Sequence, residues 1–336
     1  MATIREIAEL AQVSVGTVSF VLNGKSEKMR ISQATQKRVL EAAKELGYRP
    51  SLSARRLRST EDKEIPVIAI LWTLDARTSL ISRFLQGIQQ KSLLKDGLFE
   101  LVIQPYENGK LNEEESLLLG TRYNGAIIAN ASDKDLEYIE NNNFNVPIVI
   151  YQRQSDKYST VYVDSKKTGS MIAEKFILNG HSKIGLIIPT LSSQAVDLRT
   201  IGFKEKLSEH NLYVESSYEL YEDYSEEGGY RAVKRLIKEN KQLPTAIFFL
   251  SDQMALGGIK AFNNAGIIIP NQVEIIGHDN EDFTRFTSPS LSTVHLPVEE
   301  MAESCVRLLL EIIKHKVSSS ESVKFKSYLV ERSSSL

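Results

Sequence analysis

The feature that most constrains the fold is a regular alternation of short apolar runs with amphipathic stretches from Val67 onward. The apolar runs are residues 67–72, 101–103, 126–128, 148–151, 184–188, 246–250 and 273–276, and helical spacing lies between them in residues 84–94, 171–178, 229–237 and 254–262. Apolar strands that alternate with helices indicate parallel sheets covered on both faces. The sequence therefore predicts an α/β fold, and because this region exceeds what one hydrophobic core normally serves, we expect two lobes.

The residues before this region follow a helical pattern instead. Thr3 and Glu6 form a capping box, and helical spacing from Ile4 onward predicts a short first helix. Ser14 can cap a second helix over residues 15–22, which would stop at the following Asn-Gly pair. A third helix is expected from a Ser32 cap to Gly47.

These three helices can share a small core. The second helix has one apolar face, which we expect to pack on the first, and an opposite face of small and polar groups. The expected core residues are Ile7, Leu10, Val13, Val18, Val21, Leu22, Val39, Leu40, Ala43 and Leu46, and the opposite face carries Val15, Gly16, Ser19, Phe20 and Asn23. This is the helix-turn-helix arrangement, whose second helix enters the major groove of DNA. Residues 1–24 alone fit an ordinary helical hairpin equally well.

Charge separates the two regions. Residues 1–60 contain 11 Lys and Arg against 5 Asp and Glu, whereas residues 61–336 contain 30 against 38. A basic N-terminal module on an acidic body suits phosphate binding by the module. Residues 50–58 lie between them and could form at most two helical turns. Because helices shorter than about 12 residues are marginal in water, this segment should fold only when something holds it.

Polar side chains follow several predicted strands, and ligands of open α/β sheets bind beyond the carboxyl ends of strands. The residues are Asp75, Gln152, Arg153, Arg199 after a serine-rich loop, Ser251, Asp252 and Asp279. Such groups can bind neighbouring sugar hydroxyls, and Tyr224 could stack on a sugar ring. Asp and Ser at strand ends are also common helix caps, which is the role we favour for Asp252.

Several classes of protein are disfavoured. No phosphate-binding loop or dinucleotide fingerprint follows a predicted strand, and no nucleophile with a base is visible, so we expect neither an enzyme nor a cofactor. The single cysteine, Cys305, lies in an apolar helical pattern and is expected in the core, and the 5 histidines show no metal-ligand spacing. The sequence shows neither a signal region nor an apolar run of membrane-spanning length, so we expect a cytoplasmic protein. The pair Gly257–Gly258 is interpreted as a site of close helix packing.

Several ordered motifs resemble the lactose-repressor (LacI/GalR) family of bacterial transcription regulators. They are TIREIA at residues 3–8, VSVGTVS at 13–19, VLNG at 21–24, LGYRP at 46–50, SDQMALG at 251–257 and GHDN at 277–280. The resemblance extends from about Thr3 to Arg332. It implies a helix-turn-helix domain at 1–49, a hinge helix and linker at 50–60, and a two-lobed effector and dimerisation domain like the periplasmic binding proteins at 61–336. It also implies that the chain crosses between the two lobes near residues 161, 290 and 320. Residues 298–314 would then return to the first lobe as a helix.

The resemblance implies roles for individual residues. Val15, Gly16, Ser19 and Phe20 would face bases, while Ser14, Thr17 and Asn23 would anchor phosphates. Arg55 would fix the hinge on the DNA backbone while Leu57 wedges into the minor groove. Phe20 stands where the family usually has an arginine, so it can touch a thymine methyl but cannot bind guanine in bidentate fashion. The segment before Arg30 is longer than in the lactose repressor, and for Arg30 we favour a phosphate contact over a base contact.

In the second domain the resemblance places Arg199 and Asp279 where an arginine and an aspartate hold a sugar. Ser251 replaces an asparagine of the lactose repressor and Gln152 replaces an aspartate, which leaves the ligand open. We expect a dimeric repressor of carbohydrate-use genes that binds palindromic double-stranded operator DNA under control of a sugar-like effector. The alternative is a sugar-binding module whose helical head contacts a protein.

Overall fold

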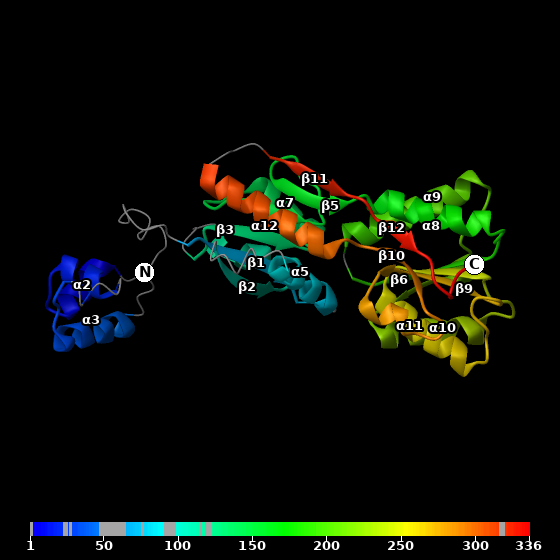
Figure 1. Cartoon of the computed structure of the whole chain (residues 1–336), viewed down its shortest axis with the longest axis horizontal. Helices are drawn as coiled ribbons and strands as arrows, with labels where there is room; N and C mark the ends of the chain where they lie inside the picture. Colours follow the sequence, from blue (N-terminus) through cyan, green and yellow to red (C-terminus); the bar gives the residue numbers. More distant parts are fainter. Residues whose placement is uncertain are drawn as a thin grey trace. The chain divides into compact units, whose positions relative to one another are not determined.

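The computed structural model describes residues 3–22, 26, 29–46, 65–74, 77–90, 99–114, 116–117, 122–191, 193–315 and 320–336. The chain separates into an N-terminal head and a larger unit that begins at Ile65 (Figure 1). Within the described ranges, no helix is long and apolar enough to cross a membrane.

The described part of the head contains three helices, α1 (Ile4–Leu10), α2 (Val15–Leu22) and α3 (Gln33–Glu45). The predicted capping box is confirmed, since Thr3 Oγ1 accepts a hydrogen bond from Glu6 N and Glu6 Oε2 accepts one from Thr3 N. Ser14 Oγ accepts the Thr17 amide at 3.0 Å and so caps α2. Ser32 Oγ does the same for the Thr35 amide at the start of α3.

The core of the head is smaller than predicted. It consists of Ile7, Ala8, Ala11, Val18, Val21, Val39, Ala42 and Ala43, with Val13 and Leu22 partly buried. Leu10, Leu40 and Leu46 are 45%, 54% and 37% exposed, so their assignment to the core was wrong. Leu10 is exposed because successive residues of a helix are turned by 100°, which places Leu10 at the edge of the buried face that contains Ile7 and Ala11. The small alanine side chains of α3 let the helices pack closely without Leu10.

The larger unit contains two six-stranded sheets. The first sheet is entirely parallel, in the order β11-β5-β4-β3-β1-β2, and the second has the order β12-β10-β9-β8-β6-β7 with only β12 antiparallel. Strands of the first sheet are β1 (Val67–Thr73), β2 (Glu100–Tyr106), β3 (Gly125–Ala129), β4 (Ile148–Tyr151), β5 (Ser159–Val163) and β11 (Ser322–Phe325). Those of the second are β6 (Ile184–Pro189), β7 (Glu219–Glu222), β8 (Ala246–Phe249), β9 (Glu274–Asp279), β10 (Ser292–His295) and β12 (Tyr328–Val330). The predicted parallel α/β architecture with two lobes is confirmed.

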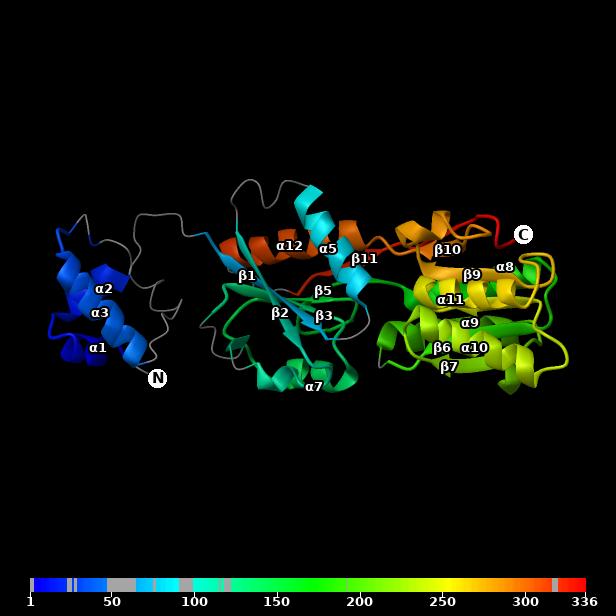
Figure 2. The ribbon, with the colours of Figure 1, turned by 90° about the horizontal axis from the view of Figure 1, so that it is seen from below.

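Helices cover both faces of each sheet. Helices α5 (Thr78–Gln90) and α12 (Val298–His315) lie on one face of the first sheet, and α7 (Asp133–Asn141) lies on the other (Figure 2). On the second sheet, α8 (Ser165–Leu178) and α9 (Gln194–Glu209) lie opposite α10 (Glu226–Glu239) and α11 (Asp252–Asn264) (Figure 1). Short 3₁₀ helices span Leu111–Glu113, Ser216–Tyr218 and Asp282–Arg285.

Three segments connect the lobes. The chain crosses between β5 and α8, between β10 and α12, and between β11 and β12, each a few residues after the predicted position. Helix α12 thereby returns to the first lobe, where it packs on α5 and the strands. Cys305 is completely buried on this helix, as predicted, and burial raises the pKa of its thiol.

Glycines allow the paired helices to approach closely. A Cβ on Gly169 of α8 would lie 1.9 Å from the Arg199 carbonyl of α9, and one on Gly257 of α11 would lie 1.7 Å from the Glu226 carbonyl of α10. Gly258 packs against the ring of Phe249. The interpretation of Gly257–Gly258 as a packing site is confirmed, and the α8–α9 contact fixes the helix that carries Arg199.

Candidate functional sites

The exposed surface of α2 is the candidate nucleic-acid interface of the head. Val18 and Val21 are buried, whereas Ser14, Val15 and Gly16 are exposed at the start of the helix. Thr17, Ser19 and Phe20 are half-buried beside them. The head also exposes the basic side chains of Arg5, Arg30, Lys37 and Arg38. An apolar face inward and small polar groups outward are what a recognition helix requires.

Four further residues were predicted to contact DNA, namely Asn23, Arg30, Arg55 and Leu57. Arg30 lies in the described loop before α3, with a positive φ of 53° that few non-glycine residues adopt. Asn23, Arg55 and Leu57 lie outside the described residues. The same is true of Asp75 among the predicted effector-binding residues.

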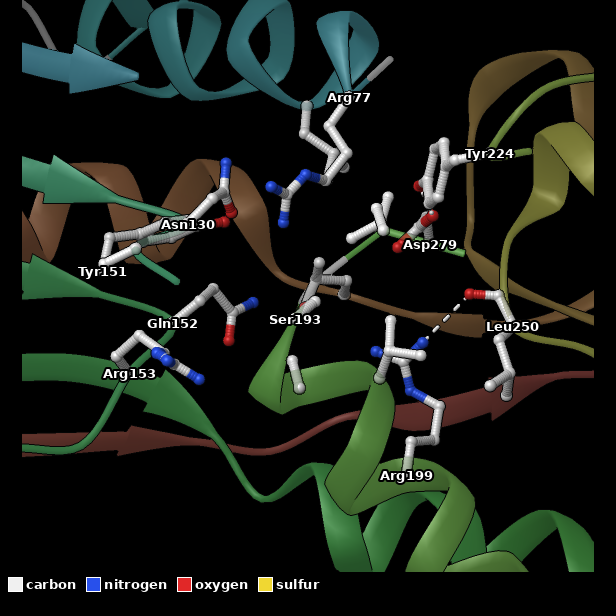
Figure 3. Close-up of a pocket in the computed structure, with 16 residues that line it drawn as sticks. Arg77, Asn130, Tyr151, Gln152, Arg153, Ser193, Arg199, Tyr224, Leu250 and Asp279 are labelled. Carbon is white, nitrogen blue, oxygen red and sulfur yellow. Dashed lines mark hydrogen bonds between the residues drawn. The ribbon is translucent and has the colours of Figure 1, made fainter. Parts of the chain in front are cut away.

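The second candidate site is a cavity between the two lobes, at the carboxyl ends of β1, β3, β4, β6, β8 and β9 (Figure 3). Gln152, Arg153, Arg199, Tyr224 and Asp279 all line it, so the structure brings together five of the predicted effector residues. Ser251 is completely buried at the start of α11 and does not line the cavity. The lining also includes Arg77, Asn130, Tyr151 and Ser193, which the sequence reasoning did not single out as ligand-binding. Arg77 follows β1 and Asn130 follows β3, so the rule that found the other strand-end residues could have found both.

Three of the lining residues have left-handed backbone conformations. Asn130, Gln152 and Asp279 have φ values of 57°, 63° and 118°, each at the end of a strand. Asparagine tolerates this region, but glutamine and aspartate at such angles cost of order 1–3 kcal/mol each. Strain of this kind persists where the surroundings dictate the direction of a side chain, and here all three residues border the same cavity.

Among the described residues that line the cavity, Asp279 is the acidic group. Its Oδ2 accepts a hydrogen bond of 2.9 Å from the Tyr224 hydroxyl, and its Oδ1 lies 2.8 Å from His278 Nδ1. Burial lowers the pKa of His278 to about 4, so the ring is neutral near pH 7 and its Nδ1–H donates to the carboxylate. Burial of Asp279 would raise its pKa, but His278, Arg199 and Tyr224 outweigh burial and lower it. Asp279 is therefore an ionised acceptor held in a fixed orientation.

Arg199 is the cation that faces Asp279 across the second lobe. Its Nη1 donates to the Leu250 carbonyl at 3.0 Å, and its Nε has no hydrogen-bond acceptor among the described groups (Figure 3). Burial lowers the pKa of this guanidinium to about 10, partly offset by Asp279, and it therefore stays charged near pH 7. A donor and an acceptor side by side suit a pair of neighbouring hydroxyl groups.

Asp252 is buried behind this pair. It is the first residue of α11, but its carboxylate accepts from Thr293 Oγ1 at 2.6 Å and Glu281 N at 2.9 Å and caps no amide of its own helix. The favoured capping role was therefore wrong, because Ser251 already occupies the N-cap position and turns Asp252 toward β10. Burial and the charge of Asp279 raise the pKa of Asp252 to about 8.

The first lobe contributes mainly donors. Arg153 is only 2% exposed, and its Nη2 binds Asp133 at the start of α7, which is largely exposed. Its Nε and Nη1, like Asn130 Nδ2, are buried without an acceptor among the described groups. Figure 3 shows Arg77, Asn130, Gln152 and Arg153 around one side of the cavity, opposite Arg199, Tyr224 and Asp279. Buried donors without acceptors are costly, so these nitrogens are available to acceptors of a polar ligand or of water in the cavity.

Both parts of the chain match known protein families. Residues 3–51 match the family "Bacterial regulatory proteins, lacI family", and residues 158–335 match "Periplasmic binding protein-like domain". The chain is 30% identical to the HTH-type transcriptional repressor PurR of Mannheimia succiniciproducens, over 99% of this chain and 98% of that protein. It is 29% identical to the probable HTH-type transcriptional repressor ExuR of Bacillus subtilis, over 96% and 95%.

A solved structure extends the comparison to the fold. The crystal structure of a LacI family transcription regulator from Clostridium acetobutylicum has 33% sequence identity and a TM-score of 0.75, and the match covers 80% of this chain and 99% of that chain. These relatives are transcription regulators and not enzymes. The chain belongs to the LacI family of bacterial regulatory proteins.

Proposed function

We propose that the protein is a transcriptional repressor that binds palindromic operator DNA as a homodimer and is controlled by a small polar effector. The observation that carries the proposal is the presence, in one chain, of an exposed recognition-helix face and a separate cavity with buried, unpaired donors. Two of the three relatives named above, PurR and ExuR, are named as a repressor and a probable repressor, which supports repression over activation.

In the proposed complex, α2 of each protomer occupies the major groove of one half-site. Val15, Gly16, Ser19 and Phe20 would face the bases, and Ser14, Thr17 and Asn23 would bind phosphates. Because Phe20 offers only apolar contact, we expect a preference for thymine at its position in the half-site. Arg30 would bind the backbone.

The segment from residue 50 to 60 would couple the two units as a hinge that folds on DNA. Arg55 would bind the phosphate backbone and Leu57 would wedge between base pairs, which kinks the duplex. We expect Leu57→Ala to weaken operator binding by roughly tenfold or more and to reduce bending, since the wedge contributes a few kcal/mol. Unchanged affinity and bending, measured by gel shift with circularly permuted DNA, would remove the hinge from the mechanism.

The effector would act by changing the arrangement of the lobes. The cavity between them has a volume of about 50 Å³, which accommodates a few water molecules but not a sugar ring. A sugar-sized ligand therefore requires the lobes or the lining side chains to move. Such a ligand controls operator binding only if its affinity differs between the DNA-bound and free arrangements. Arg199, Asp279 and Tyr224 would hold its hydroxyl groups from the second lobe, Gln152, Arg153 and Asp75 would approach from the first, and Ser251 would support Tyr224.

Two exposed apolar features of the larger unit support self-association. Strand β2 lies at the edge of the first sheet and leaves Ile103 41% exposed. Phe286 follows the last 3₁₀ helix and is 83% exposed. Open strand edges can pair with another chain, and aromatic rings are enriched in protein interfaces.

The first test is operator selection by the purified protein from a library of palindromic DNA at two salt concentrations. We expect one preferred palindrome, bound by a protein dimer, and its release by one compound from a panel of sugars, sugar derivatives and purines. Uniform binding that falls steeply with salt and shows no preferred site would mean that the head binds only phosphates. Sequence-specific binding that no small molecule changes would retain the repressor and reject the effector.

A further inference from the structure

We propose that His295 positions the loop of Asp279, residues 279–281, and that it does so only while its imidazole ring is neutral. Acidification would then loosen this loop. The inference rests on the proposed function in one respect, since Asp279 is among the residues proposed to bind the effector. His295 itself is not among the described residues that line the cavity, so it would act on the site through the loop.

The loop begins where β9 ends, beside the end of β10. Asp279 and Asn280 have φ values of 118° and 56°, so two successive residues other than glycine have left-handed backbone. Such a conformation persists only where the surroundings impose it. His295 is the last residue of β10 and pairs in register with Asp279, and residues 296–297 then cross to α12. Its ring also stacks on Tyr328 of β12, with the ring centroids 4.8 Å apart.

Two hydrogen bonds fix the side chain of Asn280. Arg332 Nη2 donates to Asn280 Oδ1 at 2.8 Å, and Asn280 Nδ2 lies 3.1 Å from His295 Nδ1. A guanidinium has only donors, so the oxygen of the amide faces Arg332 and its NH₂ group faces the ring. His295 Nδ1 is then the acceptor, which requires that it carries no proton. The form of the ring that fits is the neutral one, with its proton on Nε2.

Protonation of His295 is incompatible with this pair of hydrogen bonds. Nδ1 would carry a hydrogen and face the NH₂ group of Asn280, so two donors would oppose each other across 3.1 Å. Rotation of the amide does not restore both bonds, because its NH₂ group would then face Arg332. In either arrangement the loop loses one of the two side-chain bonds that hold it.

The charged groups near the ring favour its neutral form. Burial and the positive charge of Arg83 on α5 lower the pKa of His295. Glu299 and Glu300 at the start of α12 act in the opposite direction but do not reverse the shift. The Asp279 carboxylate is already hydrogen bonded to other side chains of the second lobe. Because Arg83 also donates to the Asp279 carbonyl at 2.7 Å, a charged ring would repel a second residue that holds the loop.

Imidazole NMR of the full-length protein tests the protonation state. The signals of His295 are identified among those of the 5 histidines by their absence from His295→Gln. We expect the proton on Nε2 at pH 7.5 and a titration midpoint below the ordinary histidine value of about 6.5. Asn280→Asp should raise the midpoint, because a carboxylate accepts from the protonated ring, and aspartate tolerates a left-handed backbone. A proton on Nδ1 at pH 7.5, or a midpoint at or above the ordinary value, would overturn the inference.

Hydrogen–deuterium exchange measures how firmly the loop is held. The peptide that contains residues 279–281 is compared between the wild type and His295→Gln at pH 7.5 and pH 5.5. Glutamine is neutral at both pH values, and the intrinsic effect of pH on exchange cancels in the ratio of the two rates. We expect this ratio, wild type over variant, to rise by roughly threefold to tenfold from pH 7.5 to pH 5.5, as the loss of one hydrogen bond predicts.

The matched control is His210→Gln, which replaces an exposed histidine at the end of α9 and should leave the ratio independent of pH. Asn280→Asp provides a second test if His295→Gln does not fold, because its loop should stay protected at pH 5.5. A ratio for His295→Gln that does not change with pH, an equal change for His210→Gln, or a loop of Asn280→Asp that loosens as the wild type does would overturn the inference. These measurements use neither operator nor effector, so failure to select an operator would reject the proposed function alone.

Discussion

Arg199 and Asp279 are the two residues on which the proposed effector site of the second lobe depends. Replacement of Arg199 by Met keeps the volume but removes the charge that faces Asp279 and the bond to Leu250. We expect effector affinity to fall by roughly tenfold to a hundredfold, from the loss of one to two hydrogen bonds of about 1.5 kcal/mol each. Calorimetric titration of the effector measures the loss. Arg231→Met, which removes a surface arginine of α10, is the control and should bind the effector normally.

Asp252 makes the stability of the folded protein depend on pH. Its pKa is raised to about 8 in the folded protein by burial and by Asp279, so the folded state keeps a proton that the unfolded state releases near pH 4. Stability from this group is therefore present below pH 4 and is lost as pH rises toward 8, by at most about 1.4 kcal/mol per pH unit. The isosteric Asp252→Asn variant lacks the titration.

The comparison of wild type with Asp252→Asn isolates this effect from other acids. We expect the free energy of unfolding of the wild type, minus that of the variant, to decrease steadily between pH 5 and pH 8 in urea titrations. Glu281, Arg199 and Asp279 surround Asp252 in both proteins, so their titration largely cancels in the difference. A difference that stays constant or increases with pH would show that Asp252 is ionised in the folded state.

Part of the cavity lining could be predicted from the sequence. Strand-end position placed Gln152, Arg153 and Asp279 at the cavity, because the carboxyl ends of parallel strands share one edge. Arg199 lies within α9, and its expected place in the site rested mainly on the family resemblance. The same rule failed for Ser251, which points into the protein. Sequence position gives the end of a strand but not the direction of a side chain, which here depends on left-handed backbone angles that only the folded structure reveals.

At the scale of elements, Arg83 joins parts of both lobes. It projects from α5 and pairs with Glu299 of α12 through Nε and Nη2, at 2.8 and 2.9 Å. It also donates to the carbonyls of Asp279 at 2.7 Å and Leu296 at 2.9 Å, which lie at the end of β9 and in the crossover before α12. Burial would lower the pKa of Arg83, but Glu299 outweighs burial and raises it, so the charge is permanent. One side chain therefore fixes a helix, a lobe crossover and the backbone of Asp279.

The substitution Arg83→Lys tests this connection. Lysine keeps the charge but cannot reach all four acceptors, so at least two hydrogen bonds are lost and the free energy of unfolding should fall by about 2 kcal/mol. Effector affinity should fall as well, because the Asp279 carbonyl loses its donor. Urea unfolding and calorimetry measure the two effects. Arg231→Lys, on the exposed face of α10, should change stability by less than about 0.5 kcal/mol. Normal effector binding in Arg83→Lys would separate this arginine from the site.

Some strands could be predicted from sequence patterns and others could not. The apolar strands β1, β4, β6 and β8 could be predicted because both of their faces are buried by helices. Strands β5 and β10 carry buried polar residues such as Thr160 and Thr293, and β7 is a charged edge strand, so none of them forms an apolar run. Their pairing depends on neighbouring strands that are distant in the sequence, and a local sequence pattern carries no information about such strands.

At the scale of the whole molecule, the proposed repressor requires two copies of the chain to read a palindrome, because one α2 covers one half-site. The described surface of the larger unit offers an anchor for such an assembly in Phe286. This ring is 83% exposed, yet it follows a 3₁₀ helix whose Thr284 is buried and hydrogen bonded to the Glu281 carbonyl. Aromatic side chains, including phenylalanine, are enriched in the buried centre of protein interfaces.

We therefore expect Phe286→Asp to weaken the dimer. Light scattering coupled to gel filtration should give the wild type twice the mass of the 37.8 kDa chain and shift the variant toward the monomer. The loss of a central aromatic anchor costs about 2 kcal/mol or more, so the dissociation constant should rise by roughly thirtyfold. Operator affinity should fall with it, because a monomer binds a single half-site.

The control for this prediction is Tyr213→Asp, which places the same charge at another exposed aromatic residue, 73% exposed, in the loop after α9. It should remain dimeric and bind the operator as the wild type does. Dimers of unchanged stability in Phe286→Asp would move the interface elsewhere, for example to the edge strand β2 and Ile103. The wild-type protein could instead be monomeric at micromolar concentration and still bind a palindrome with two copies. That result would mean that DNA itself assembles the pair, because a protomer bound at one half-site raises the local concentration of the second protomer.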